Sequence, residues 1–282
     1  MTFIKAKKSL GQNFLTDESV AHRIIDLVSP NRDEVFIEVG PGTGVLTRML
    51  VDRGGYVVAV EIDPRLVQSL SHSLKQQNLW VVAADALKLN WPDLITKAKA
   101  ELRAFHPDQP GSTRVRIVAN LPYYISTPII EVFLAMHNQV FDMTLMLQKE
   151  VAERITSAPG RKEYGYLSVL VQYHCEASLL FEVPPWAFSP IPKVESAVVR
   201  LKLRERPTVH VEDETRYFKL VRAAFSQRRK TILNNLKASS AALNFSRPIG
   251  AALEDSGIDA QRRAETLSLA EFASLDKALF SR

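Results

Sequence analysis

The chain has 282 residues, of which 46% are hydrophobic and 24% are charged, and its net charge is +5. This composition is typical of a globular protein with a sizeable core, and the basic balance is compatible with a nucleic-acid partner. One cysteine excludes an internal disulfide and a thiolate zinc cluster, and the histidines lack metal-ligand spacing, so we expect no metal. No apolar run suits a signal peptide or a membrane span, so we expect a cytoplasmic protein.

Short apolar runs alternate with amphipathic segments from about residue 35 to residue 148. The pattern predicts strands at 35–37, 56–60, 79–82, 115–118 and 143–147, and helices at 45–51, 64–74 and 128–136. Strands separated by helices favour parallel pairing, so we expect an α/β sandwich. The polar stretch between Lys97 and Arg114, which contains HPDQPGST, predicts a mobile surface loop.

A change of pattern follows the sheet-forming segments. Helical spacing continues to about residue 173, and strands are predicted at 177–183 and 194–203, joined by the proline-rich PPWAFSPIPK. RERPT at 204–208 then breaks the pattern, and only helical spacing follows, with Phe218, Val221 and Phe225 on one face. We therefore predict an α/β domain over residues 1–206 and a smaller all-α domain over residues 207–282.

A glycine loop, Glu38-Val39-Gly40-Pro41-Gly42-Thr43-Gly44, follows the first predicted strand. Glycines at such a turn let backbone approach a ligand that a Cβ would exclude. The G-x-G-x-G spacing departs from the G-x-G-x-x-G dinucleotide fingerprint, which disfavours a nicotinamide dehydrogenase. The Glu38 carboxylate would repel a pyrophosphate but suits the ammonium and sulfonium of S-adenosylmethionine. The pattern resembles the first motif of Rossmann-like methyltransferases.

Two more acidic residues stand at strand ends. Glu61 closes the second strand, where a carboxylate can accept from both ribose hydroxyls, although NAD enzymes place an acid there too. Asp85 follows the third strand and suits the adenine amino group of the cofactor. Each acid alone could be a helix cap or a solvated loop residue. Together with the glycine loop they predict an S-adenosylmethionine pocket.

The sequence ANLPYYIST at 119–127 follows the fourth strand and resembles the [Asn/Asp/Ser]-Pro-Pro-[Tyr/Phe] signature of methyltransferases that modify exocyclic amino groups. Adenine N6 is a poor nucleophile, and hydrogen bonds from N6–H to the Asn120 side-chain oxygen and the Leu121 or Pro122 carbonyl would stabilise the positive charge of the transition state. Tyr123 offers a ring face to a flipped base. The alternative is a strand-end turn with aromatic packing, which is what we expect of Tyr124.

Four segments together resemble the ribosomal RNA adenine N6-dimethyltransferases over nearly the whole chain. They are NLPYYIST, KKSLGQNFL at 7–15, FSPIPKVESAVV at 188–199 and AFSQRRKTILNNL at 224–236. The pattern is most similar to the bacterial small-subunit (16S) rRNA branch, which is linked to kasugamycin sensitivity. This resemblance implies N6,N6-dimethylation of two adjacent adenosines in a hairpin near the RNA 3′ end, during ribosome assembly.

The resemblance also implies roles for single residues. It places Asn13 and Leu15 against the cofactor, with Gly40, Glu61, Asp85 and Asn120 lining the pocket and Glu38 and Gly42 in support. Phe188, which opens F-x-P-x-P-x-V, becomes the candidate for the opposite wall of the base slot, unless it is a plain core aromatic.

The resemblance assigns RNA binding to three consecutive cations, Arg228, Arg229 and Lys230, although such a run can also be a solvated face. The helical domain would dock, as part of a monomer, on the pre-assembled small ribosomal subunit. Two alternatives stay open. One is the large-subunit rRNA adenine N6-methyltransferase branch, which favours Ile after Asn in the NLPY motif. The other is a non-catalytic assembly or transcription factor of the same fold that binds RNA.

Overall fold

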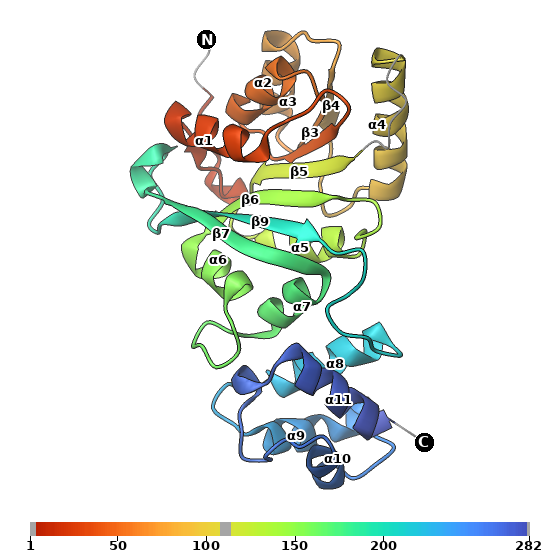
Figure 1. The fold of residues 1–282 in the computed structure, drawn as a ribbon. Coiled ribbons are helices and arrows are strands. Elements are labelled where there is room, and N and C mark those ends of the chain that lie inside the picture. Colours follow the sequence, from red (N-terminus) through yellow and green to blue (C-terminus); the bar gives the residue numbers. More distant parts are fainter. Residues whose placement is uncertain (1–3, 108–113, 281–282) are drawn as a thin grey trace. The chain divides into compact units, whose positions relative to one another are not determined.

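The computed structural model describes residues 4–107 and 114–280. The chain forms two compact units, Met1–Ala152 with Ser178–Leu203, and Glu153–Ala177 with Arg204–Arg282. The first unit contains most of a seven-stranded sheet, and the second is mainly helical (Figure 1). Residues 108–113 of the predicted HPDQPGST loop lie outside the described part of the chain.

The sheet has the order β4-β3-β2-β5-β6-β9-β7. Its first five strands pair in parallel, and β9 runs antiparallel to β6. All seven predicted strands are present, which confirms the α/β fold. Their bounds are β2 Val35–Val39, β3 Tyr56–Glu61, β4 Leu79–Ala83, β5 Val115–Asn120, β6 Asp142–Gln148, β7 Cys175–Val183 and β9 Ser196–Leu203.

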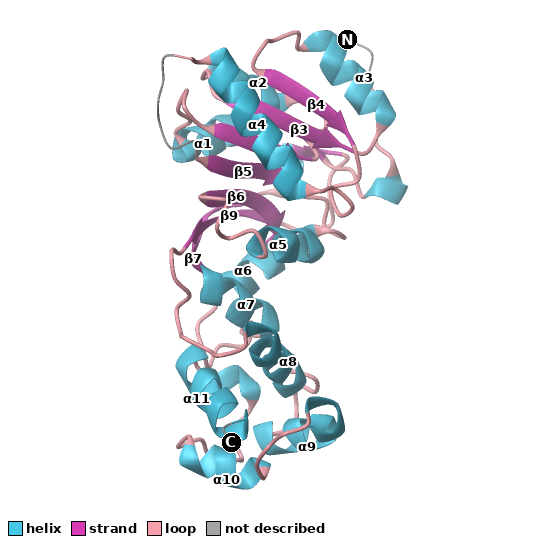
Figure 2. Cartoon of the chain, turned by 90° about the vertical axis from the view of Figure 1, so that its right-hand side faces the viewer, coloured by secondary structure: helices cyan, strands magenta, loops and turns pink. Residues whose placement is uncertain are grey.

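Helices cover both faces of this sheet because its central strands are apolar on both sides. On one face, Phe36 and Val118 pack with residues of α1 (Glu18–Val28) and α2 (Val45–Asp52). On the other face, α4 (Trp91–Phe105) contacts β2 and β3 (Figure 2). Two more helices complete the layer structure, α3 (Pro64–Ser73) and α5 (Ser126–Leu134).

The loop predicted from Lys97 is wrong over its first part, because α4 continues to Phe105. The Asn90 side chain caps this helix by accepting from the Asp93 N–H. Its buried positions recur at helical spacing, while charged residues fill the exposed face and give the stretch its polar character. The buried residues are Trp91, Leu94, Ile95, Ala98 and Leu102.

The strand order reverses between β2 and β5, since β3 and β4 lie on one side of β2 and β6 lies beyond β5. In open parallel sheets, ligands bind outside the carboxyl ends of the strands at such a switch point. A second small sheet, which the sequence did not predict, adds the N-terminal segment to this edge. In it β1 (Phe14–Leu15) pairs antiparallel with β8 (Phe188–Ser189).

The helical unit has its own apolar core. Tyr164, Val169 and Tyr173 belong to this core, so residues 153–177 group with the C-terminal helices rather than with the sheet. The predicted division at residue 206 had placed these residues in the α/β domain. Segments distant in sequence share a unit here because hydrophobic contact, not chain order, decides the grouping. The helices are α6 Lys149–Thr156, which crosses the division between the units, and α7 Tyr166–His174, α8 Glu214–Ala224, α9 Ile232–Leu243, α10 Ile249–Asp255 and α11 Leu269–Phe280.

Candidate functional site

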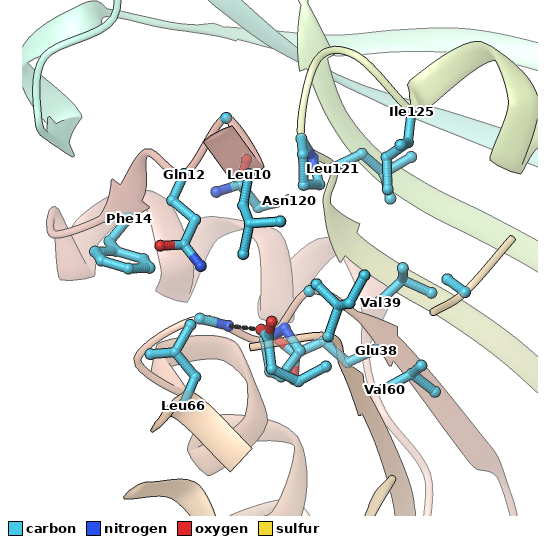
Figure 3. A pocket seen from close by; sticks show the side chains of 18 of the residues that line it. Leu10, Gln12, Phe14, Glu38, Val39, Val60, Leu66, Asn120, Leu121 and Ile125 are labelled. Atoms are coloured by element: carbon cyan, nitrogen blue, oxygen red, sulfur yellow. Dashed lines mark hydrogen bonds between the residues drawn. The ribbon is translucent and has the colours of Figure 1, made fainter. Parts of the chain in front are cut away.

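A pocket opens at the carboxyl ends of β2, β3, β4 and β5, at the switch point of the sheet (Figure 3). It encloses about 1140 Å³ of space, part of it open to solvent. The N-terminal segment, residues 10–15, forms one wall. All of the predicted cofactor residues line it: Asn13, Leu15, Glu38, Gly40, Gly42, Glu61, Asp85 and Asn120.

The glycine loop follows β2 with left-handed backbone at Gly40 (φ 69°) and Gly42 (φ 58°). A Cβ at Gly42 would lie 3.1 Å from the Phe14 ring, so a side chain there would push into the N-terminal wall. The Gly42 N–H donates to the Glu61 carboxylate over 3.3 Å. Glycine is therefore needed both for the turn and for its close approach to the pocket.

Glu38 is buried at the pocket floor, where its carboxyl accepts from the Thr47 hydroxyl over 2.6 Å. The pKa of Glu38 is raised from 4.5 to about 8, chiefly by burial. The nearby Glu61 carboxyl adds to this rise, and the Thr47 hydrogen bond opposes it. Among the described residues, no cationic side chain forms an ion pair with Glu38 or Glu61. A pocket with two uncompensated buried acids fits a cationic ligand, because a positive charge would favour their ionised forms.

Glu61 ends β3 and is held in place by backbone. One carboxylate oxygen accepts from the Asp63 N–H over 2.8 Å and the other accepts from Gly42. Desolvation raises the pKa of this carboxyl, and the backbone bonds partly oppose the shift. Each oxygen keeps a second lone pair that can accept from a ribose hydroxyl, so the geometry fits the predicted contact.

Asp85 lies beyond β4 and lines the pocket, and its carboxylate also makes the local loop contacts that the sequence left open as the alternative. Its Oδ1 accepts from the Leu87 N–H over 3.0 Å, which is a local turn, and its Oδ2 lies 3.8 Å from the Lys88 ammonium. The pocket also contains two exposed apolar side chains next to these acids, Ile62 and Leu87. Apolar faces beside a carboxylate suit a flat heteroaromatic ring with an amino group.

The N-terminal segment is attached to the loop after β3 through Asp63, which is fully buried. Its carboxylate accepts from the Lys7 ammonium over 3.2 Å and from the Gln12 amide over 3.3 Å. Arg65, together with these two partners, lowers the pKa of Asp63 well below its usual range. These bonds hold the wall formed by residues 10–15 against the cofactor side of the pocket.

Asn120, the last residue of β5, donates from its amide Nδ2 to the Asn13 carbonyl over 3.2 Å. This bond assigns the amide orientation and leaves Oδ1 as an acceptor, for which no donor is present among the described residues. The Pro122 carbonyl accepts from the Ile125 N–H in a tight turn, whereas the Leu121 carbonyl has no such partner within the described chain. Asn120 Oδ1 and the Leu121 carbonyl therefore have no protein donor within the described chain, whereas the Pro122 carbonyl keeps only its second lone pair free.

The two tyrosines differ in environment. The half-buried Tyr123 hydroxyl lies 2.9 Å from the Ser196 hydroxyl, and burial raises the pKa of this phenol. Tyr124, which we expected to have a packing role, is 57% exposed and lines the pocket. Its ring would lie 3.1 Å from a Cβ at Gly11, which places it against the N-terminal wall.

Phe188 does not line the pocket. It is 2% exposed and belongs to the apolar cluster beneath α1, where its strand β8 pairs with β1 at Leu15. In this structure it is the core aromatic that the sequence left as an alternative. Leu15, by contrast, contacts both the pocket and this cluster.

The family model for ribosomal RNA adenine dimethylase matches residues 3–279. A ribosomal RNA small subunit methyltransferase A from Geobacillus thermodenitrificans (strain NG80-2) is 45% identical over 275 residues, which cover 97% of this chain and 90% of the relative. The chain belongs to the ribosomal RNA adenine dimethylase family. This confirms the predicted enzyme class, and the methyl donor is S-adenosylmethionine.

Two solved structures share the architecture. A dimethyladenosine transferase from Plasmodium falciparum aligns with a TM-score of 0.73 at 25% identity, covering 93% of this chain and 95% of its own. The 23S rRNA methyltransferase ErmE aligns with a TM-score of 0.68 at 28% identity, covering 95% of this chain and 99% of its own. These similarities confirm the Rossmann-like methyltransferase fold.

Several pocket residues were not predicted from the sequence. Gln12 and Phe14 lie inside the GQNFL motif, which was a signal for them, but only Asn13 and Leu15 were assigned a role. Ile62 follows Glu61 directly and Leu87 comes two residues after Asp85, so an apolar residue close to these acids could have been noticed. Asp63 does not line the pocket, and its contacts with the N-terminal wall could not be predicted because Gln12 and Lys7 are 51 and 56 residues away in sequence.

Replacing Glu38 with Gln tests the cost of ionising this buried carboxyl. Its pKa is raised from 4.5 to about 8, so between these values the folded protein keeps a proton that the unfolded chain releases. The free energy of unfolding therefore falls as the pH rises, by about 1.4 kcal/mol per pH unit. In thermal unfolding without cofactor, E38Q should gain stability relative to wild type from about pH 5 to about pH 8.

The matched control is Glu18→Gln, at an exposed position in the first turn of α1. It should keep the wild-type pH dependence. A constant stability difference between E38Q and wild type across the whole range would contradict the prediction.

Proposed function

We propose that this protein transfers methyl groups from S-adenosylmethionine to the N6 of two adjacent adenosines in a hairpin near the 3′ end of small-subunit (16S) rRNA. The observation that carries the chemistry is the Asn120 amide, which donates to Asn13 and presents Oδ1 as an acceptor. The curated relatives are named small-subunit rRNA methyltransferases, which supports this substrate.

The proposed mechanism uses hydrogen-bond acceptors rather than a strong base. Asn120 Oδ1 and the Leu121 carbonyl accept from the two N6–H groups, which makes the nitrogen more tetrahedral and stabilises the charge that develops on it. Bound S-adenosylmethionine supplies the electrophilic methyl group. Pro122 fixes the backbone of the turn, and the Tyr123 ring stacks on the flipped base. The methylated nitrogen is acidic and can release its proton to water.

The acidic half of the pocket would hold the methyl donor. Glu38 faces the cationic part, Glu61 accepts from the ribose, and Asp85 with the apolar pair Ile62 and Leu87 receives the adenine. Asn13 and Leu15 close the site from the N-terminal wall. These assignments are supported by burial and by the absence of cationic partners for Glu38 and Glu61 within the described chain.

The alternatives have less support. A large-subunit substrate has a structural relative in the 23S rRNA methyltransferase ErmE at 28% identity, below the 45% of the small-subunit relative. A non-catalytic RNA-binding factor would not need the acceptors at Asn120 and Leu121. Neither alternative is favoured by a feature of the pocket.

For RNA binding, we propose a surface on the helical unit where three loops meet. The Gly160 N–H donates to the Glu265 carbonyl over 2.8 Å, and the Arg228 guanidinium donates to the Lys162 carbonyl. Arg228 also lies 3.7 Å from the Glu265 carboxylate, which partly neutralises it. The exposed cations of these loops are Arg161, Lys162, Arg228, Arg229, Lys230 and Arg263.

Such a surface suits the phosphates of folded RNA, for which positive charge supplies affinity without sequence preference. The pre-assembled small subunit is the partner we propose, bound by a monomer in the cytoplasm. No helix in the described part of the chain has the length and apolar character to cross a bilayer.

The central test is incubation with labelled S-adenosylmethionine and small subunits that lack the modification, followed by nucleoside mass analysis. We expect N6,N6-dimethyladenosine in small-subunit rRNA at two adjacent positions. Large subunits serve as the control substrate and should stay unlabelled. Label in large-subunit RNA alone, or no label in either, would reject the proposed function in favour of one of the alternatives.

Asn120→Ala tests the mechanism. Loss of an acceptor at the reacting nitrogen should lower kcat by about 10²–10³. The affinity for S-adenosylmethionine, measured by calorimetry, should change far less. Asn90→Ala, which removes the cap of α4, controls for lost stability. If the Asn120 variant methylates at the wild-type rate, orientation of N6 by this amide is not part of the reaction.

A triple substitution of Arg228, Arg229 and Lys230 by Ala tests the RNA surface. Loss of these phosphate contacts should weaken subunit binding and reduce the slope of log K against log salt by about 2–3. The matched control removes three cations from α4, with Lys97, Lys99 and Arg103 replaced by Ala. Equal slopes for the two triple variants would show that the proposed surface does not contact RNA.

A further inference from the structure

Tyr123 is anchored by a residue far away in sequence. Its hydroxyl lies 2.9 Å from the hydroxyl of Ser196, the first residue of β9. Tyr123 follows β5, and β6 lies between β5 and β9 in the sheet. The tyrosine side chain therefore reaches across the carboxyl end of β6, where Gln148 pairs with Ser196.

This contact is buried on the Ser196 side and half-buried on the Tyr123 side. Ser196 is 1% exposed, and no other hydrogen bond of its hydroxyl is present among the described residues. A buried hydroxyl without a partner costs folding free energy. The buried Ser196 hydroxyl therefore favours the conformation in which the Tyr123 hydroxyl stays its hydrogen-bond partner. The backbone of Tyr123 is fixed separately, because its carbonyl accepts from the Ser126 hydroxyl over 3.0 Å. The Ser196 bond thus acts on the ring alone.

The two methyl transfers place different demands on that ring. Adenosine offers two N6–H groups, which Asn120 Oδ1 and the Leu121 carbonyl can both accept. After one transfer the nitrogen keeps a single N–H, so one of these acceptors loses its partner. Stacking on Tyr123 must then carry a larger share of the orientation that keeps the nitrogen in line with the next methyl group.

We propose that Ser196 is a positioning residue for Tyr123 that sustains the second methyl transfer. It acts through the hydroxyl pair, which fixes the ring over the base while the monomethylated amine returns for another reaction. The proposal rests on the proposed function and deepens it, because it concerns the degree of methylation at the same site. Ser196 is not among the residues that line the pocket, so it would act through Tyr123.

The experiment compares N6-methyladenosine with N6,N6-dimethyladenosine in small-subunit rRNA at matched total conversion. Ser196→Ala should raise the ratio of monomethyl to dimethyl product by about two- to tenfold. The affinity for S-adenosylmethionine should stay at the wild-type value, since the cofactor half of the pocket is unchanged. Tyr123→Phe, which keeps the ring and loses the hydroxyl, should raise the ratio to a similar extent.

A double-mutant cycle decides whether the two hydroxyls act as one. The S196A/Y123F variant should resemble either single variant, and Ser196→Thr, which keeps the hydroxyl, should restore the wild-type ratio. Ser240→Ala, on the exposed side of α9, is the matched serine control and should leave the ratio unchanged.

Different outcomes reject different claims. An unchanged ratio in Y123F and in folded S196A, or additive effects in the double variant, would overturn the role of Ser196. If S196A does not fold, the ratio in Y123F decides the question. A wild-type protein that forms no dimethyladenosine would instead reject the proposed function.

Discussion

The hydrogen bond from the Asn120 amide to the Asn13 carbonyl joins the two halves of this site. It connects the end of β5 to the N-terminal wall of the pocket, and it decides which atom of the amide faces the reacting amine. With Nδ2 engaged, only Oδ1 is available, and an oxygen is the acceptor that N6–H groups require. The chemistry we propose therefore depends on a contact between residues 107 positions apart.

Two buried acids, Glu38 and Glu61, line the other half of the pocket. Glu38 and Glu61 lie out of solvent without a cationic partner in the described chain, and burial raises the pKa of each. An arrangement that costs the free protein stability is favourable once a cation binds, because the ligand supplies the missing charge. Asp63, close by, is in the opposite situation: its cationic partners lower its pKa and hold the N-terminal segment in place. Neighbouring carboxyls thus have different roles, set by their partners.

In the function we propose, the helical unit supplies affinity for RNA and the α/β unit carries out the methyl transfer. The cations of the helical unit lie on loops that are joined by Gly160, Lys162 and Glu265, whereas the groups that we propose as catalytic lie at the ends of sheet strands. Phosphate contacts of this kind give salt-dependent binding, and base orientation in the pocket gives the reaction. A protein that modifies a nucleotide within a large RNA assembly needs both.

The sequence by itself determined the parallel sheet, its acidic strand ends and the NLPY turn, because strand periodicity, glycine spacing and proline act over a few residues. It also indicated the family, whose motifs are local. Only the tertiary structure decided that Ser196 reaches Tyr123, that Asp63 binds Lys7 and Gln12, and that Phe188 is buried in the core. It also showed that residues 153–177 pack with the C-terminal helices, and that α4 covers the first half of the stretch expected to be a loop. Strand order, register and burial bring such groups together or take them out of water, and none of these is encoded in the spacing of neighbouring residues.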